Sequence, residues 1–175
     1  VNNSGISNIE RNSQPIYRYD YTYWGSPMTT ASNFNLFNLS PGTLADKFYS
    51  WQPTLSGNAG DWLLLNPTST NMETGLGYAI RAPQTFSTNP ATTSIFTGTF
   101  TGTPSNGDIN IPISVGTDSN IGISIGGAII TADDDQWNLI SNPYPSAIDI
   151  IDFLSEPTNI PLVDGTIYLW THNSA

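Results

Sequence analysis

The chain contains no cysteine among its 175 residues. A disulfide framework and thiol chemistry are therefore excluded, and any bound metal would need histidine nitrogen or oxygen ligands. Histidine is almost as scarce, since His172 is the single example. Its alternation with Tyr168 and Trp170 is typical of a half-buried ring on a strand, whereas catalysis would need a nucleophile or carboxylate held beside it.

Charge is also scarce. Only 10% of the residues are charged, and 14 acidic against 4 basic residues give a net charge of −10. Lys and Arg are the groups that neutralise phosphates, so neither nucleic acid nor an anionic membrane surface is expected as a partner. No apolar run approaches the roughly 18 residues needed to cross a bilayer, so the sequence predicts no membrane insertion.

The signatures of common enzymes are missing too. The sequence contains neither a Gly-x-Ser-x-Gly nucleophile elbow nor a His-Glu-x-x-His zinc motif. A glycosidase would need a pair of carboxylates, and no spacing distinguishes one pair among the 14 acidic residues. The sequence therefore predicts a non-catalytic protein, and a glycoside-active enzyme domain remains as an alternative.

Aromatic residues, in contrast, are abundant and regularly spaced near the start of the chain. Tyr17, Tyr19, Tyr21 and Tyr23 occupy every second position of residues 16–24. Side chains alternate between the two faces of a strand, so this spacing predicts four rings on one face. Such an aromatic wall either fills a core or offers sugars and proteins a stacking surface.

Short alternating or apolar segments separated by turn residues continue along the chain. The pattern predicts strands at 47–51, 61–65, 75–82, 94–102, 108–115, 121–125, 128–131, 136–140 and 165–172. In 108–115 we expect Ile109, Ile111, Ile113 and Val115 to form a buried stripe. About ten short strands favour an all-β fold, an antiparallel β-sandwich of jelly-roll type.

One short helix is expected near 147–154. Ser146 is a suitable N-cap, Asp149 follows three residues later as in a capping box, and Pro157 ends the segment. Residues 1–15 are polar and are expected to be a linker or an N-terminal edge segment, and residues 16–175 a single β-sandwich module. The chain starts at Val1 without an initiator Met, so we expect a fragment of a larger protein.

Several sequence blocks together resemble a known type of module. They are Tyr-Thr-Tyr-Trp-Gly-Ser-Pro-Met at 21–28, Phe-Tyr-Ser-Trp at 48–51, Gly-Tyr-Ala-Ile-Arg-Ala-Pro at 77–83, the stretch 137–149 with Asn-Pro-Tyr-Pro-Ser-Ala-Ile-Asp, and the stretch 164–173 with Tyr-Leu-Trp-Thr-His-Asn. In this order they resemble modules of very large exported, adhesin-like proteins of Bacteroidetes, especially flavobacteria, which are cargo of type IX secretion. The resemblance implies a secreted or cell-surface location and a non-enzymatic role, and it transfers no binding residues.

Two sets of residues are candidates for ligand binding. Trp51, Trp62 and Trp170 lie beside polar turns, where an indole ring can stack on the apolar face of a sugar. The alternative is that these rings are buried, since aromatic side chains usually build cores. Three adjacent carboxylates, Asp133, Asp134 and Asp135, are the candidate Ca²⁺ ligands, because a hard cation relieves their repulsion; a solvated hairpin tip is the alternative.

Two functional hypotheses follow. In one, the chain is a module of an adhesin-like surface protein and contributes to attachment or to a surface filament, with a glycan ligand and Ca²⁺. In the other, it is a passive structural spacer or stalk domain whose partners are neighbouring modules of the same polypeptide. Exposed aromatic rings would favour the first hypothesis, and modules stacked end to end would favour the second.

Overall fold

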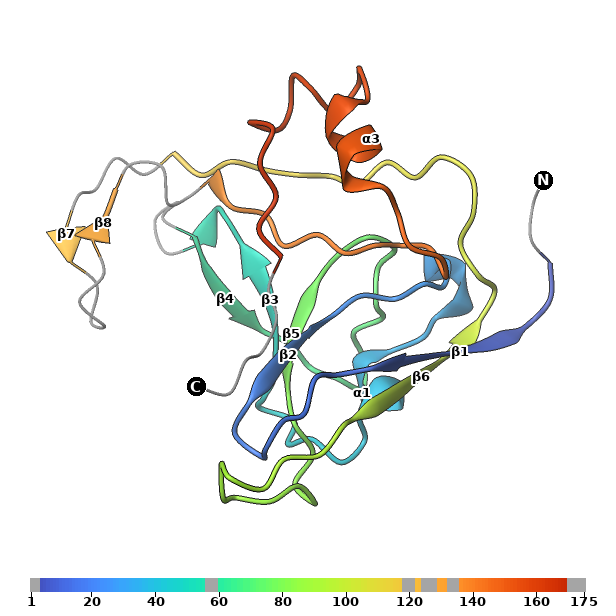
Figure 1. Cartoon of the computed structure of the whole chain (residues 1–175), viewed down its shortest axis with the longest axis vertical. Helices are drawn as coiled ribbons and strands as arrows, with labels where there is room; N and C mark the ends of the chain where they lie inside the picture. Colours follow the sequence, from blue (N-terminus) through green and yellow to red (C-terminus); the bar gives the residue numbers. More distant parts are fainter. Residues whose placement is uncertain (1–3, 56–59, 118–121, 124–128, 132–135, 170–175) are drawn as a thin grey trace.

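The computed structural model describes residues 4–55, 60–117, 122–123, 129–131 and 136–169. Within them the chain is mostly β, with strands arranged in three antiparallel sheets (Figure 1). The strands are β1 (Ser7–Asn12), β2 (Tyr21–Trp24), β3 (Phe48–Gln52), β4 (Asp61–Leu64), β5 (Tyr78–Arg81), β6 (Thr97–Gly102), β7 (Gly122–Ile123) and β8 (Ile129–Ile130). The helices are η1 (Thr30–Ser32), α1 (Leu36–Leu39) and α3 (Ile150–Ser155).

The core lies between two of these sheets. Strands β1 and β6 form a two-stranded ribbon, which crosses a four-stranded sheet of order β2-β5-β3-β4 (Figure 1). Trp24 of β2 meets Phe100 of β6 with ring centroids 6.3 Å apart, and Phe34 meets Phe100 at 5.4 Å. Because both sheets contribute side chains to one core, the prediction of an all-β, sandwich-like fold is confirmed.

The ribbon follows the expected alternation closely. Gly98 and Phe100 of β6 are buried, whereas Thr97, Thr99 and Thr101 point to solvent. A Cβ atom on Gly98 would lie only 2.6 Å from the Leu39 Cδ1, so the ribbon approaches α1 as closely as glycine permits. The partner strand β1 comes from the N-terminal segment, which is therefore an edge strand over residues 7–12.

The tyrosine-rich segment starts its strand later than its spacing predicts. Tyr17 to Asp20 form a turn, in which the Asp20 Oδ2 accepts from the Tyr17 N–H at 2.9 Å and the Asp20 N–H donates to the Tyr17 carbonyl at 3.1 Å. This Asp-closed turn interrupts the alternation. The prediction of four rings on one face of a strand is therefore wrong for Tyr17 and Tyr19. Of the four tyrosines, Tyr21 and Tyr23 are the two that lie on β2.

The strand predicted at 108–115 does not form. These residues lie outside all sheets, Ile109 and Ile111 are half-buried, and Ile113 and Val115 are 37% and 58% exposed. Pro112 has no N–H to donate to a ladder, and the backbone N–H and carbonyl of Ser114 bond to the Asn138 side chain rather than to a strand. The predicted buried stripe is wrong. Residues 165–169 are likewise outside strands, and the rest of 165–172 lies outside the described residues.

The predicted helix is confirmed with a different N-cap. Helix α3 begins at Ile150, and the Asp149 Oδ1 accepts from the backbone N–H groups of Ile151 (2.8 Å) and Asp152 (3.2 Å). Asp149, rather than Ser146, therefore satisfies the first free N–H groups. In the part of the chain described here, no helix has the length and apolar character of a membrane span.

Candidate functional site

The four-stranded sheet has a second, outward face that is almost as aromatic as its core face. On β2 the buried Trp24 alternates with Tyr23, and on β3 the buried Phe48 alternates with Tyr49. Tyr23 pairs with Ala79 of β5, and Ala79 pairs in turn with Tyr49. Paired residues share a face, so these three side chains form one row across the outside of the sheet.

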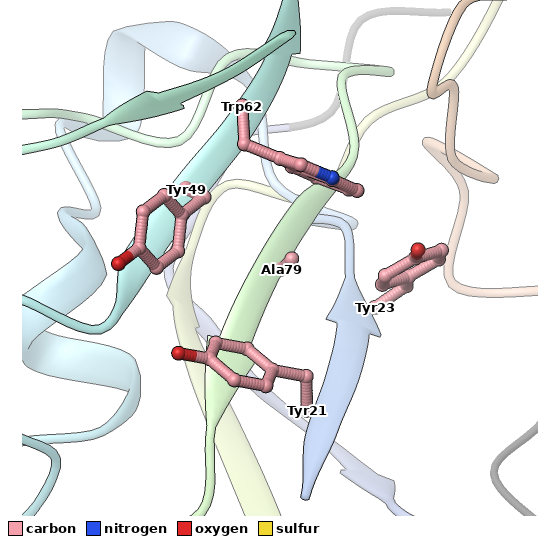
Figure 2. Close-up of a pocket in the computed structure, with 5 residues that line it drawn as sticks. All are labelled: Tyr21, Tyr23, Tyr49, Trp62 and Ala79. Atoms are coloured by element: carbon pink, nitrogen blue, oxygen red, sulfur yellow. The ribbon is translucent and has the colours of Figure 1, made fainter. Parts of the chain in front are cut away.

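Around this row the sheet is hollowed into a groove. Its volume is about 370 Å³, and it is lined by Tyr21, Tyr23, Tyr49, Trp62 and Ala79. Figure 2 shows the four rings standing around Ala79, which comes from the central strand β5. The small Ala79 side chain leaves space between the rings and forms the floor. We call this site the aromatic groove.

The rings form the walls of the groove and not a flat platform. Tyr21 and Tyr49 lie on opposite sides with centroids 6.0 Å apart and planes inclined by 59°. Tyr23 and Trp62 are 5.8 Å apart at 48°. Rings in contact at such angles present a concave apolar surface on which one side of a ligand can lie.

The two tryptophans predicted as ligand-binding residues are neighbours on this face. Trp62 of the edge strand β4 is 37% exposed and lines the groove, while Trp51 of β3 is half-buried. Their rings meet edge to face at 5.5 Å, and the Trp51 Nε1 donates to the Trp137 carbonyl at 2.8 Å. Trp51 is therefore the cross-strand neighbour of Trp62 on the same face of the sheet and packs against its ring. Trp170, the third predicted residue, lies outside the described residues.

The Tyr21 and Tyr23 hydroxyls keep their protons at neutral pH. Burial, followed by the neighbouring Tyr49, raises the pKa of Tyr21, and burial raises the pKa of Tyr23. The Tyr49 hydroxyl donates to the Asp46 carbonyl at 2.9 Å and is also hydrogen-bonded to the Tyr21 hydroxyl. The groove thus combines apolar ring faces with phenol oxygens that can accept hydrogen bonds.

Tyr49 and Ala79 were missed by the sequence-based prediction. Nothing in their local spacing places them beside Tyr21 and Tyr23, because the row depends on pairing between strands far apart in the chain. The available signal was the alternation Phe48-Tyr49-Ser50-Trp51, which sends Tyr49 and Trp51 to the same face.

The calcium prediction stays a prediction. Asp133, Asp134 and Asp135 lie outside the described residues. Within the ranges that are described, no group of three or more His, Asp or Glu side chains is placed to hold a metal ion.

Comparison with known proteins identifies a family and nothing more specific. A family model described as a domain of unknown function (DUF8693) matches residues 1–175, which is the whole chain. No curated protein and no solved structure matches the chain.

Proposed function

The chain belongs to the DUF8693 domain family, and because that family's description assigns no activity, we propose from the aromatic groove that it is a non-catalytic, glycan-binding module of a secreted or cell-surface adhesin-like protein. The single observation that carries this proposal is the gathering of four aromatic rings around a small floor residue on the outside of the sheet.

Sugars suit such a groove because a pyranose ring has apolar C–H faces and a polar rim. The faces of Tyr23 and Trp62 can stack on the C–H face, while the hydroxyls of Tyr21 and Tyr49 can bond to the sugar hydroxyls. Aromatic side chains bury large areas when they fill a core, so an aromatic outer face is a sign of a partner. This supports recognition of a hydroxyl-rich ligand.

The lining also favours binding over bond cleavage. Its five residues carry phenol, indole and methyl groups, and none of them is a carboxylate or an imidazole. Glycoside hydrolysis needs two carboxyl groups on either side of the scissile bond. A ligand held in this groove would meet neither a general acid nor a carboxylate nucleophile among the lining residues.

The location and the role in adhesion are supported by the resemblance of the sequence blocks to modules of exported adhesin-like proteins. A single shallow groove of about 370 Å³ is expected to bind weakly. Repetition of modules in a long parent protein would raise the local concentration of sites and so strengthen attachment. We therefore place the protein outside the cell, acting as one of several modules.

A passive spacer is the second candidate, and a different observation favours it. Ile151, Leu162 and Leu169 in the C-terminal part are 77%, 64% and 73% exposed. A neighbouring module packed against these side chains would bury them, as in a stalk of stacked domains. In that case the aromatic groove would have no ligand of its own.

A glycan array probed with the multimerised protein tests the proposal. We expect binding to a defined group of glycans, and loss of that signal in Trp62→Ala. Phe37→Ala is the matched control, because Phe37 is similarly exposed (41%) but lies on α1. No glycan signal from folded multimer, or equal signals from both variants, would contradict glycan binding in this groove and leave the spacer function.

Calcium binding at Asp133–Asp135 remains a separate part of the proposal. If an ion is held there, a chelator should lower the melting temperature and added Ca²⁺ should restore it. At 100 times the dissociation constant the expected gain is about 2.7 kcal/mol. Identical melts in chelator and in millimolar Ca²⁺ would argue for a solvated hairpin tip.

A further inference from the structure

One end of the aromatic groove carries positive charge. Arg81 of β5 pairs with Tyr21 of β2. On its other side, the backbone N–H of Arg81 donates to the backbone carbonyl of Lys47, the residue before β3, at 3.2 Å. Continuing the register of Phe48 with Ile80 sets Lys47 directly opposite Arg81. Tyr21, Arg81 and Lys47 therefore form a row on the outer face, about 7 Å from the row of Ala79.

Two cations side by side are unexpected in this protein. The chain has four basic residues against 14 acidic ones, and two of the four stand next to each other here. Like charges directly opposite on a sheet are destabilising. The other two basic side chains, Arg11 and Arg18, bind backbone carbonyls of Gly25, Tyr144 and Phe86. The side chains of Lys47 and Arg81, in contrast, make no hydrogen bond to a backbone carbonyl of the described residues.

The two cations differ in how far their charge is already balanced. The Lys47 Nζ forms an ion pair with the neighbouring Asp46 at 2.7 Å, and Asp46 is also within electrostatic range of Arg81. Arg81 makes no ion pair of its own with the described residues, and its Nε is buried without a hydrogen-bond partner among them. Its guanidinium lies over the Tyr19 ring, 5.7 Å from the centroid.

A ring-supported arginine is well suited to bind an oxyanion. The guanidinium is planar, always charged and able to donate two parallel hydrogen bonds to a carboxylate or a sulfate. Contact with Tyr19 restricts its side chain, so less conformational entropy is lost on binding. The Tyr21 hydroxyl, on the same row, is hydrogen-bonded to Tyr49 and can accept a hydrogen bond from a sugar hydroxyl.

From this charge complementarity we infer that the ligand of the aromatic groove is an acidic glycan. Its carboxylate or sulfate group binds at Arg81, with Lys47 adding attraction, while the adjoining sugar ring packs over Tyr23 and Trp62. The inference rests on the proposed glycan binding and specifies its ligand class. A uronic acid and a sulfated sugar share the chemistry that the cationic end of the groove recognises.

Matched acidic and neutral polysaccharides test the inference with the full chain. Polygalacturonate is compared with its methyl ester, and dextran sulfate with dextran, by isothermal calorimetry and affinity electrophoresis. We expect at least one acidic polymer to bind about tenfold more tightly than its neutral counterpart. That preference should shrink as salt rises, because mobile ions screen the exposed charge. The pair that shows the preference identifies carboxylate or sulfate as the group bound.

Variants assign the preference to individual side chains. Arg81→Gln should abolish it, Lys47→Gln should weaken it by roughly threefold, and Trp62→Ala should lower binding of both forms. Arg18→Gln, which removes a charge elsewhere, is the control. Equal binding of acidic and neutral forms would overturn this inference and leave glycan binding intact. If none of the polymers or array glycans binds a protein with an unchanged melting temperature, the proposed function itself fails.

Discussion

Residues 4–105 and residues 106–169 of this protein use similar amino acids in very different ways. We refer to them as the N-terminal and C-terminal regions. Among the described residues, the buried core side chains lie between Ile16 and Phe100, and the C-terminal region adds only the buried ring of Pro143. Instead, large apolar side chains such as Ile151 and Leu169 are more than 70% exposed there. The N-terminal region therefore contains the hydrophobic core, and the C-terminal region is held by its contacts with the N-terminal region.

The backbone contacts that attach the C-terminal region gather along a short seam, and side-chain bonds from Trp51 to Trp137 and from Arg11 to Tyr144 add to it. The Gly77 N–H donates to the Leu139 carbonyl at 3.0 Å, and Leu76 and Ile140 form an isolated bridge. A Cβ on Gly77 would lie 2.5 Å from the Leu139 Cγ, so this contact is tight. Beyond the seam, α3 and the β7–β8 hairpin extend away from the sandwich (Figure 1). The difference shows that alternating apolar residues need paired strands before they form a core.

The largest expected effect separates the two regions directly. Phe100→Ala removes a fully buried ring and should lower the free energy of unfolding by about 3–5 kcal/mol. Ile151→Ala, at a residue that is 77% exposed, should change it by less than about 0.5 kcal/mol. Urea unfolding followed by tryptophan fluorescence measures both. Similar losses for the two variants would mean that the C-terminal region has a core of its own.

A second prediction concerns the link between the regions. The Arg11 guanidinium donates to the carbonyls of Gly25 (3.0 Å) and Tyr144 (2.7 Å), and so joins β1 to the C-terminal region. Arg11→Met keeps much of the apolar stem and should cost about 2 kcal/mol. Limited proteolysis should then cut residues 106–169 faster. Arg18→Met, whose Nε bonds to the Phe86 carbonyl within the N-terminal region, should leave that cleavage rate unchanged.

A smaller and local effect is expected at helix α3. Asp149→Ala removes the side chain that accepts from the N–H groups of Ile151 and Asp152, and should weaken the helix by about 1 kcal/mol. Amide exchange at the start of α3 should then accelerate about fivefold, while global unfolding is unchanged. Ser146→Ala is the control because the sequence suggested Ser146 as the cap. Faster exchange in Ser146→Ala, and not in Asp149→Ala, would instead identify Ser146 as the N-cap.

The smallest effect depends on pH. Burial raises the pKa of Tyr78 above its usual value, and its hydroxyl accepts from the Glu73 N–H at 2.9 Å. The folded state therefore holds this proton more tightly than the unfolded state. Stability is complete below the unfolded pKa of about 10 and is lost as pH rises through the folded pKa. Urea unfolding at several alkaline pH values should show this decline, and Tyr78→Phe should reduce it. An identical decline in the variant would assign the effect to other tyrosines.

Local patterns predicted local structure well. The alternation of β6 was predicted because Gly98 and Phe100 face inward at a period of two, and that period depends on neighbouring residues alone. The same reasoning failed before Tyr21, because Asp20 closes a turn whose hydrogen bonds override the alternation. It failed again around Pro112, because the segment pairs with none of the strands that the structure describes.

The candidate site was predicted in part for the same reason. Trp62 was identified from its position beside a polar turn, and Tyr21 and Tyr23 from their spacing. Tyr49, Ala79 and the Arg81–Lys47 pair depend on the register of β2, β5 and β3, which no local pattern contains. Pairing between distant segments is set by the shared core. Residues on the outer face are brought together only as a consequence.

The floor of the aromatic groove provides a way to sort other members of the family by a single position. Ala79 is small, and the space above it exists because no longer side chain fills it. A relative with leucine or phenylalanine at the corresponding position would keep the same strands and rings but have its groove filled from below. We therefore expect the residue at this position to divide the family into members that retain a ligand and members that serve only as structure, and alignment of the family can reveal that division before any binding is measured.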